Sequence, residues 1–144
     1  MWAADAASRA LGMELVEVGD GTATVRMTVR DDMVNGHGLC HGGLVAALAD
    51  SAFALACNSR GVSTVAAGFD VTFLRPSRAG DVLEATAGER SPAGRSGIYD
   101  VTVRVAGEPV ADASLLHAVD ASPSWVAPDC GRGARRPARR RRGR

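Results

Sequence analysis

The sequence has few aromatic residues and no lysine. Phenylalanine, tyrosine and tryptophan together make up 4% of the 144 residues, so the core must be built mainly from valine, leucine, alanine and methionine. All 17 basic residues are arginines. The chain does not open on a basic segment followed by an apolar one, and we therefore expect no export signal.

Long apolar segments and paired cysteines are also missing. The longest apolar run, 44–57, is too short to cross a bilayer and contains Asp50, so we expect no membrane-spanning role. Cys40, Cys57 and Cys130 are an odd set without metal-ligand spacing, which is typical of a reducing compartment. The chain length allows one domain with a workable core. We expect a cytoplasmic globular protein.

Charge is divided unevenly along the chain. Eight arginines lie between positions 132 and 144, whereas residues 1–130 carry nine arginines against 16 acidic residues, a formal charge of −7. The tail has no apolar periodicity, so we expect it to be disordered. Such a tail can bind an anionic surface, but nothing in the body supports a nucleic-acid partner and none is expected. The predicted organisation is one domain over 1–121 with a linker and tail over 122–144.

Hydrophobic periodicity predicts two strands, one long helix and four further strands. Alternating apolar residues predict strands over 14–18 and 22–30, joined by a glycine-rich turn. The segment 41–58 is predicted to be a helix that other structure wraps on all sides, because its interior is almost entirely apolar. The later strands are expected at 69–75, 82–87, 99–105 and 110–119. Short turns favour an antiparallel sheet around the helix, an α+β fold.

Chemistry is indicated between residues 35 and 58. Gly42 and Gly43 lie where the helix begins, where amide N–H groups lack intrahelical acceptors and a ligand carbonyl can approach closely. Asp50 follows about 12 Å further along the helix. We expect Asp50 to be buried, with a raised pKa, and therefore to be a candidate catalytic group. Asn35 supplies a neutral amide from the preceding loop.

These residues have other interpretations. Asp50 is alternatively the N-cap of a second helix, although no glycine or proline interrupts the apolar run. His41 is either a structural hydrogen-bonding residue or a base. His37 and His41 have metal-like spacing but only one nearby acid, so no metal site is predicted. Cys57 is expected to pack in the core, and Cys40 has no evident paired base.

The pattern His-Gly-Gly, five residues, Ala-Asp over 41–50 resembles the PaaI-type thioesterases, hotdog-fold enzymes of phenylacetate degradation. The resemblance spans about residues 9–120 and includes the segments 35–37, 50–54, 58–59, 73–76 and 79–81. It implies a hotdog fold, in which an antiparallel sheet wraps one long central helix. It also implies a homodimer with active sites at the subunit interface, often doubled into a homotetramer, and no metal or redox cofactor.

The resemblance also implies roles for individual residues. Asp50 becomes the nucleophile or general base, the Gly42 amide polarises the thioester carbonyl, and Asn35 orients the substrate or the attacking water. The implied reaction hydrolyses the thioester of (hydroxy)phenylacetyl-CoA-like substrates to free acid and CoA. A phenylalanine is expected to stack on the substrate ring, and two arginines are expected to bind the CoA phosphates. The predicted substrate-binding residues are His41, Gly43, Phe53, Arg75 and Arg78.

The sequence departs from the family at one functional group. Some hotdog thioesterases place a hydroxyl near the nucleophile, but the aligned positions here are Ala54 and Ala66, so Ser51, Ser63 or Thr64 would have to supply it. Two other functions are weighed. A hotdog hydratase or dehydratase would need a histidine-containing glycine-proline loop, which is missing. A non-catalytic acyl-CoA-binding module would usually carry a helix-turn-helix, for which the first twelve residues are too few.

Overall fold

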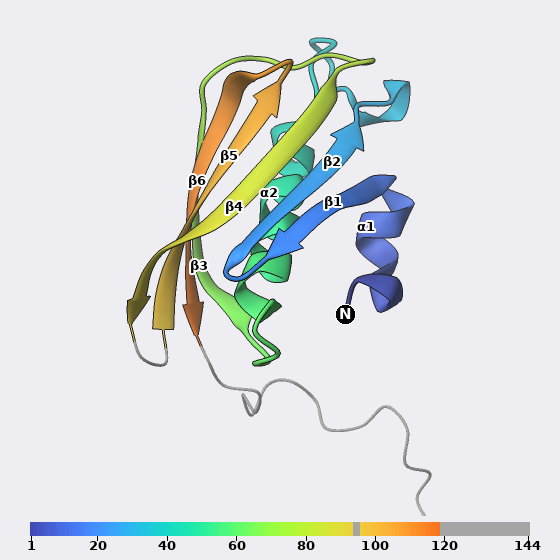
Figure 1. The fold of residues 1–144 in the computed structure, drawn as a ribbon. Coiled ribbons are helices and arrows are strands. Elements are labelled where there is room, and N and C mark those ends of the chain that lie inside the picture. Colours follow the sequence, from blue (N-terminus) through green and yellow to red (C-terminus); the bar gives the residue numbers. More distant parts are fainter. Residues whose placement is uncertain (94–95, 119–144) are drawn as a thin grey trace, which may run out of the picture.

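The computed structural model describes residues 1–93 and 96–118 and contains one six-stranded sheet. The strand order is β1-β2-β4-β5-β6-β3, and every neighbouring pair is antiparallel. The predicted order of two strands, one long helix and four strands is confirmed (Figure 1). The elements are η1 (Trp2–Ala4), α1 (Ala6–Ala10), β1 (Met13–Gly19), β2 (Thr22–Thr28), η2 (Asp31–Met33), α2 (Gly42–Asn58), β3 (Val65–Phe73), β4 (Val82–Ala93), β5 (Ser96–Val105) and β6 (Glu108–Ala118). The predicted linker and arginine-rich tail lie outside the described residues.

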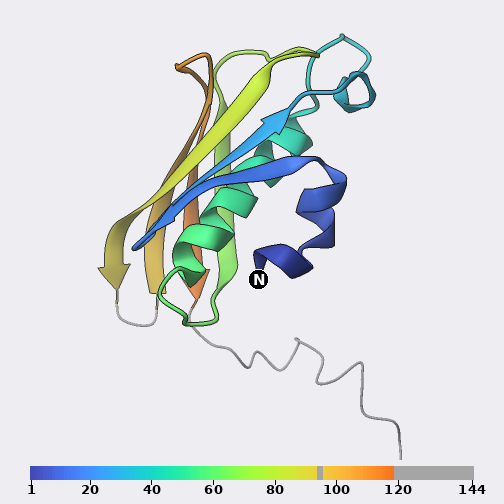
Figure 2. The same ribbon diagram turned by 45° about the vertical axis from the view of Figure 1, so that its right-hand side comes forward.

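The long helix α2 lies across one face of the curved sheet, most closely against β2 and β4 (Figures 1 and 2). The face toward the sheet is buried and carries Val45, Leu48, Ala49, Ala52, Phe53 and Ala56. The opposite face is not buried and carries Gly43, Ala46, Ala47, Asp50 and Ala54. The predicted antiparallel sheet around one long helix is confirmed, and in the single chain the face of α2 that turns away from the sheet stays partly exposed. The sheet covers only one face of α2. The other face also has a mostly apolar sequence, because it carries several alanines.

Aromatic residues anchor the core between α2 and the sheet. The ring of Phe53 meets that of Tyr99 on β5 edge-to-face, with centroids 5.3 Å apart and planes at 80°. Such a pair contributes about 0.5–1.5 kcal/mol beyond the area that it buries. Val25 and Met27 of β2 are also fully buried, as the predicted alternation requires. These contacts fix the rotation of α2 about its own axis and so decide which residues face away from the sheet.

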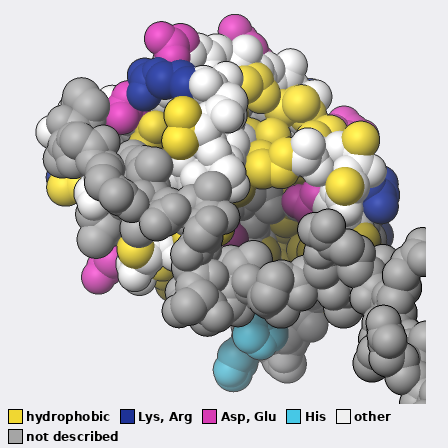
Figure 3. Space-filling model, turned by 90° about the horizontal axis from the view of Figure 1, so that it is seen from below, with side chains coloured by type: hydrophobic (Ala, Val, Ile, Leu, Met, Phe, Trp, Pro, Cys, Tyr) yellow, Lys and Arg dark blue, Asp and Glu magenta, His cyan; other side chains and the backbone are white. Residues whose placement is uncertain are grey.

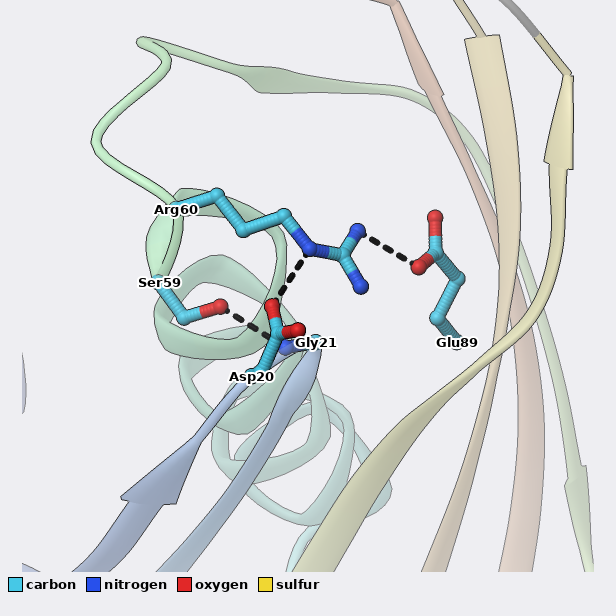
Figure 4. A network of polar contacts seen from close by, with 5 residues as sticks. All are labelled: Asp20, Gly21, Ser59, Arg60 and Glu89. Carbon is cyan, nitrogen blue, oxygen red and sulfur yellow. Dashed lines mark hydrogen bonds and ion pairs between the residues drawn. The ribbon is translucent and has the colours of Figure 1, made fainter.

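The C-terminal end of α2 is tied to the sheet by polar contacts (Figure 4). Gly21 donates its backbone N–H to Ser59 Oγ at 2.9 Å, and Arg60 bridges Asp20 at 2.5 Å and Glu89 at 2.6 Å. These bonds join the helix end to the β1–β2 turn and to β4. Exposed ion pairs contribute little free energy, so the network chiefly holds the helix in register with the sheet.

The N-terminal segment contains a short helix that the sequence pattern did not predict. α1 follows Asp5, whose side chain accepts a hydrogen bond from the Ser8 backbone N–H at 3.0 Å and so caps the helix. The segment folds back from the start of β1 toward α2 (Figures 1 and 2). Trp2, before α1, and Leu11, directly after it, pack against the core. Residues 2–11 therefore belong to the folded domain.

Both edges of the sheet expose large hydrophobic side chains. On β3 these include Val65, Phe69 and Phe73, and the last of these is 52% exposed. On β1 they include Val16 and Val18. Hydrophobic side chains are also exposed on the face of the molecule seen from below (Figure 3). Within the described ranges, no helix has the length and apolar character needed to span a membrane.

Candidate active site

The amide of Gly42 is the first of α2 and is open to a ligand. The three amides that follow are occupied: Gly43 donates to His41 Nδ1 at 3.3 Å, and Leu44 and Val45 donate to the His41 carbonyl. For the Gly42 N–H, no acceptor is found among residues 1–93 and 96–118. A free donor at the positive end of a helix dipole can stabilise negative charge on a carbonyl oxygen.

His41 is the N-cap of α2, and its ring acts as a hydrogen-bond acceptor for that helix. Because Nδ1 accepts the Gly43 N–H, the His41 ring in this arrangement is the neutral tautomer with its proton on Nε2. His41 and Gly43 were both predicted to contact the substrate. In the structure the His41 ring and the Gly43 amide are hydrogen-bonded to each other. In this structure they organise the helix start and thereby leave the Gly42 N–H as the available donor.

Asn35 organises the loop that leads to α2. Its Oδ1 accepts hydrogen bonds from the backbone N–H groups of His37, at 2.9 Å, and Leu39, at 3.3 Å. Its backbone N–H also donates to the Leu39 carbonyl at 2.7 Å. With the oxygen used by the loop, the Nδ2 group is the part of this side chain that can donate to a ligand. Asn35 therefore offers a second donor on the same side as Gly42.

A pocket of about 330 Å³ adjoins the start of α2. Its polar lining includes Asn35, Gly42 and Arg75, three of the predicted site residues. Its remaining lining is Leu39, Cys40, Val45, Phe73, Leu74, Pro76, Ser77 and Val110. Most of the pocket wall is apolar with a few convergent donors, which is typical of a small-molecule site.

The ring of Phe73 lies directly over Gly42. A Cβ atom added to Gly42 would lie 3.0 Å from Phe73 Cζ and 3.3 Å from Cε2, closer than ordinary contact distance. Glycine at this position therefore lets the aromatic ring lie close to the helix start. Sequence analysis did not single out Phe73 as a site residue. Its place at the end of β3, just before Leu74 and Arg75, was the only signal for that role.

Asp50 lies on the face of α2 that turns away from the sheet. Its side chain is exposed in the single chain, so the predicted burial beside the core is wrong. The reason is the orientation of α2, because Ala49 and Phe53 point into the core and the Asp50 position points away from it. Partial desolvation is the main factor that raises the pKa of Asp50, and the nearby Asp5 carboxylate adds to it. The predicted direction of the pKa shift is confirmed.

Asp50 and Gly42 lie far apart along α2 within the single chain. Eight residues separate them along a continuous helix, a rise of about 12 Å. The carbonyl carbon and oxygen of a thioester are bonded to one another, about 1.2 Å apart. In agreement with this separation, Gly42 lines the pocket at the helix start but Asp50 does not. The two candidate groups are therefore separated in space within the single chain.

Three other predicted site residues make contacts within the chain itself. Phe53 is 1% exposed and packs on Tyr99, which contradicts the predicted stacking on a substrate ring. The reason is again the rotation of α2, which turns this position into the core. Arg75 lines the pocket and pairs with Glu108 at 2.7 Å. Arg78 is exposed beside the pocket end, and its backbone N–H donates to Asp81 Oδ2 at 2.7 Å.

The thiols and hydroxyls near α2 differ in how they are bound. Cys57 is buried, as predicted, and burial raises its pKa to about 11. Burial also raises the pKa of Cys40, whose thiol is held in the pocket wall. Of the candidate hydroxyls, Thr64 donates to the Val62 carbonyl at 3.0 Å, whereas Ser51 lies 3.0 Å from a hydroxyl of α1. In the described part of the chain, no three metal-ligating side chains lie together.

The chain is similar to known thioesterases over most of its length. A family model described as the thioesterase superfamily matches residues 37–111. Over 103 residues the chain is 47% identical to acyl-coenzyme A thioesterase PaaI of Escherichia coli, an alignment that covers 72% of this chain and 74% of that protein. The chain belongs to the thioesterase superfamily. It is a thioester hydrolase of the hotdog fold, as the sequence resemblance predicted.

Solved structures of thioesterase relatives have the same architecture. The PaaI protein of E. coli superposes with a TM-score of 0.82 at 41% identity, covering 83% of this chain and 88% of that one. The smu.793 protein of Streptococcus mutans, solved bound to acetyl-CoA, superposes with a TM-score of 0.72 at 26% identity, covering 75% and 88%. The matched family region begins at His37, so α1 and the first two strands of this thioesterase lie outside it.

Proposed function

We propose that this thioesterase hydrolyses acyl-CoA thioesters in the cytoplasm, with Asp50 as general base and the Gly42 amide as oxyanion donor. The observation that carries the proposal is the free Gly42 N–H at the start of the helix that also presents Asp50. The raised pKa of Asp50 supports a base, because a carboxylate with a pKa closer to neutrality accepts a proton more readily. Two free thiols, Cys40 and Cys57, suit a reducing compartment.

The proposed reaction needs one water and no cofactor. Asp50 takes a proton from the water as its oxygen attacks the thioester carbon. The carbonyl oxygen becomes an oxyanion, which accepts a hydrogen bond from the Gly42 N–H, while the Asn35 amide orients the thioester. When the tetrahedral intermediate collapses, the carbon–sulfur bond breaks and the thiolate takes the proton to leave as CoA. Release of free thiol from acyl-CoA, followed with a thiol-reactive dye, tests the activity directly.

The active site proposed here combines Gly42 of one chain with Asp50 of another. The separation of about 12 Å along α2 requires this, since both groups must reach one carbonyl. The exposed face of α2, with Asp50 and its flanking alanines, is available for a second copy. A relative's structure contains acetyl-CoA, and we expect Arg75 and Arg78 to contact the CoA phosphates at the pocket rim.

The edge of β3 is the surface that we propose for dimerisation. An unpaired edge with exposed Val65, Phe69 and Phe73 would favour aggregation if a partner did not cover it. Phe73 also lies over Gly42, so a partner at this edge would sit next to the oxyanion donor. The same contact would thus bury the strand edge and complete the site.

Replacing Phe69 with lysine is expected to convert the dimer to monomer and to lower activity at least about tenfold. The charge would be placed in the middle of the proposed interface, where it would lose its hydration. Size-exclusion chromatography with light scattering measures the mass. Val16→Lys is the matched control, because Val16 is equally exposed on the opposite edge strand, β1. An unchanged mass for Phe69→Lys would exclude this edge as the interface.

For the substrate, we propose aryl-acetyl thioesters such as phenylacetyl-CoA and its hydroxylated forms. The pocket beside Gly42 is small and mostly apolar, with Val45, Phe73 and Val110 in its wall. Phe73 takes the stacking role first assigned to Phe53, because it is the exposed aromatic ring at the site. A pocket of about 330 Å³ suits a ring better than a long chain.

Phenylacetyl-CoA is expected to give a kcat/KM at least about tenfold above that of palmitoyl-CoA. Hexanoyl-CoA provides an acyl group of intermediate length, and hydroxyphenylacetyl-CoA tests the polar end of the pocket. Phe73→Leu is expected to reduce the aryl preference while hexanoyl-CoA turnover changes little. A clear preference for palmitoyl-CoA would reject the aryl substrate and leave the thioesterase activity standing.

A further inference from the structure

A chain of hydrogen bonds connects the N-terminal helix to the helix that carries Asp50. Ser8 Oγ donates to Asp5 Oδ2 at 2.7 Å, and Ser8 Oγ lies 3.0 Å from Ser51 Oγ. Ser8 is only 3% exposed, although its side chain is polar. Ser51 directly follows Asp50 in α2. The bonds therefore link a second carboxylate, through two hydroxyls, to the residue next to the proposed base.

The direction of these hydrogen bonds follows from the protons available. An ionised carboxylate can only accept, so the single proton of Ser8 goes to Asp5. The contact between the two serines then needs its proton from Ser51. With that proton committed, the lone pairs of Ser51 Oγ can only accept a further bond. The Asp5–Ser8 pair thus fixes Ser51 as an acceptor, which a free hydroxyl would not be.

Asp5 also acts on Asp50 through its charge. The hydrogen bonds from Ser8 lower the pKa of Asp5, so it is ionised at neutral pH, and its charge helps to raise the pKa of Asp50. Arg9, on the same helix as Ser8, acts in favour of the ionised Asp5. Cys57, the titratable group near Asp50 on α2 itself, is neutral in this range because its pKa is about 11.

We propose that Asp5 and Ser8 are positioning residues of the active site, which hold Ser51 as a hydrogen-bond acceptor beside Asp50 for the attacking water. This inference rests on the proposed thioesterase function and on the general-base role of Asp50. A water that gives one proton to Asp50 needs an acceptor for its other hydrogen if its lone pair is to face the thioester carbon. Ser51 is that acceptor, and it takes the place of the hydroxyl missing at Ala54 and Ala66.

The role of the hydrogen bond between Ser8 and Ser51 is tested with Ser8→Ala, Ser51→Ala and the double variant. Ser8→Ala is expected to lower kcat about threefold to tenfold with KM unchanged, as loss of one neutral hydrogen bond does. Ser51→Ala removes the acceptor itself and is expected to lower kcat by at least as much. Because the hydrogen bond of Ser8 reaches the water only through Ser51, the double variant should be no slower than Ser51→Ala at neutral pH. Ser51→Thr keeps the hydroxyl and should recover activity.

The effect of the Asp5 charge on Asp50 is tested with Asp5→Asn, which keeps a good N-cap for α1. Activity needs ionised Asp50 and so falls as the pH drops through the pKa of Asp50. Removing the Asp5 charge lowers that pKa, so the acid limb of the kcat profile is expected to move to lower pH. Glu14→Gln is the matched control, since Glu14 is an exposed acid on β1 whose charge is not among the influences on Asp50. Its profile should coincide with that of the wild type.

Two results would overturn the inference. One is an acid limb that stays in place in Asp5→Asn. The other is a double variant whose kcat is the product of the two single losses, which would mean that Ser8 acts independently of Ser51. Wild-type turnover of acyl-CoA is measured first, because its absence would reject the proposed function itself. Melting temperatures of every variant separate loss of fold from loss of rate.

Discussion

Replacing Asp50 with asparagine is expected to lower kcat for acyl-CoA hydrolysis at least about 100-fold while the protein stays folded. The amide has the shape of the carboxylate but cannot accept the proton of the attacking water. Substrate binding depends on the pocket at the start of α2, which Asp50 does not line, so KM should change little. Stopped-flow or steady-state thiol release with phenylacetyl-CoA measures both constants.

The same substitution has an expected effect on stability, with a sign set by the pKa shift. Because the folded state raises the pKa of Asp50, this group favours folding at low pH, and that contribution is lost as the pH rises through the folded-state pKa. At neutral pH the ionised side chain therefore destabilises the fold. Asp50→Asn should melt at the wild-type temperature or above it, and the difference should grow from acid to neutral pH.

Asp112→Asn is the matched control for Asp50→Asn, because Asp112 is an exposed aspartate on β6. Its kcat and melting temperature should equal those of the wild type. Near-wild-type turnover by folded Asp50→Asn would remove Asp50 from the mechanism altogether. Inactive protein with a lowered melting temperature would instead assign Asp50 a structural role.

The regular elements could be predicted because their patterns arise from burial on one face. In β2, Ala23, Val25 and Met27 alternate with polar residues, and all three are buried, as expected for a half-buried strand. β4 was predicted too short, over 82–87, because its second half is polar. That half is held by pairing with β5 as far as Ala93, and pairing with a distant strand leaves no local mark in the sequence.

The exposure of Asp50 could not be predicted from periodicity. Alanine is apolar but small, so Ala46, Ala47 and Ala54 suggest buried positions although they are only partly buried in the single chain. The direction of the pKa shift was still predicted correctly, because a carboxylate beside apolar neighbours is partly desolvated even on an open face. The family motif located the residue, whereas only the packing of Phe53 on Tyr99 determines where its side chain points.

The contacts made by α1 were equally beyond the sequence. A five-residue helix has no measurable periodicity, and the one local signal was Asp5 placed three residues before Ser8 in the manner of an N-cap. The bond between Ser8 and Ser51 joins residues 43 positions apart. Phe73 over Gly42 is another such contact. Residues that surround a site are thus harder to predict than the motif at its centre.

Mixing two inactive variants is expected to restore activity if each site takes its groups from two chains. In a dimer of Asp50→Asn with Gly42→Val, one site combines the intact Gly42 of the first chain with the intact Asp50 of the second. The other site carries both substitutions. Heterodimers isolated through two different tags should therefore recover about half of the wild-type rate, since each has one of two sites intact.

Gly42→Val is a suitable partner because it blocks the oxyanion donor without touching Asp50. Even the first carbon of the new side chain would lie 3.0 Å from Phe73 Cζ, so the ring must move and the close approach of a thioester carbonyl is lost. Alone, this variant should lose activity about 100-fold or more, as removal of an oxyanion donor does. Its melting temperature must be matched to the wild type before the mixing result is interpreted.

The control mixture combines Asp50→Asn with Asp50→Ala, two chains with the same defect. It should stay inactive under identical co-expression and purification, because neither of its sites has an intact Asp50. Recovery in the first mixture alone would establish that Gly42 and Asp50 of different chains act on one thioester. If neither mixture recovers while both single variants are inactive and dimeric, the two groups belong to one chain's site. The helix geometry would then have to change on substrate binding, because about 12 Å separates them along α2.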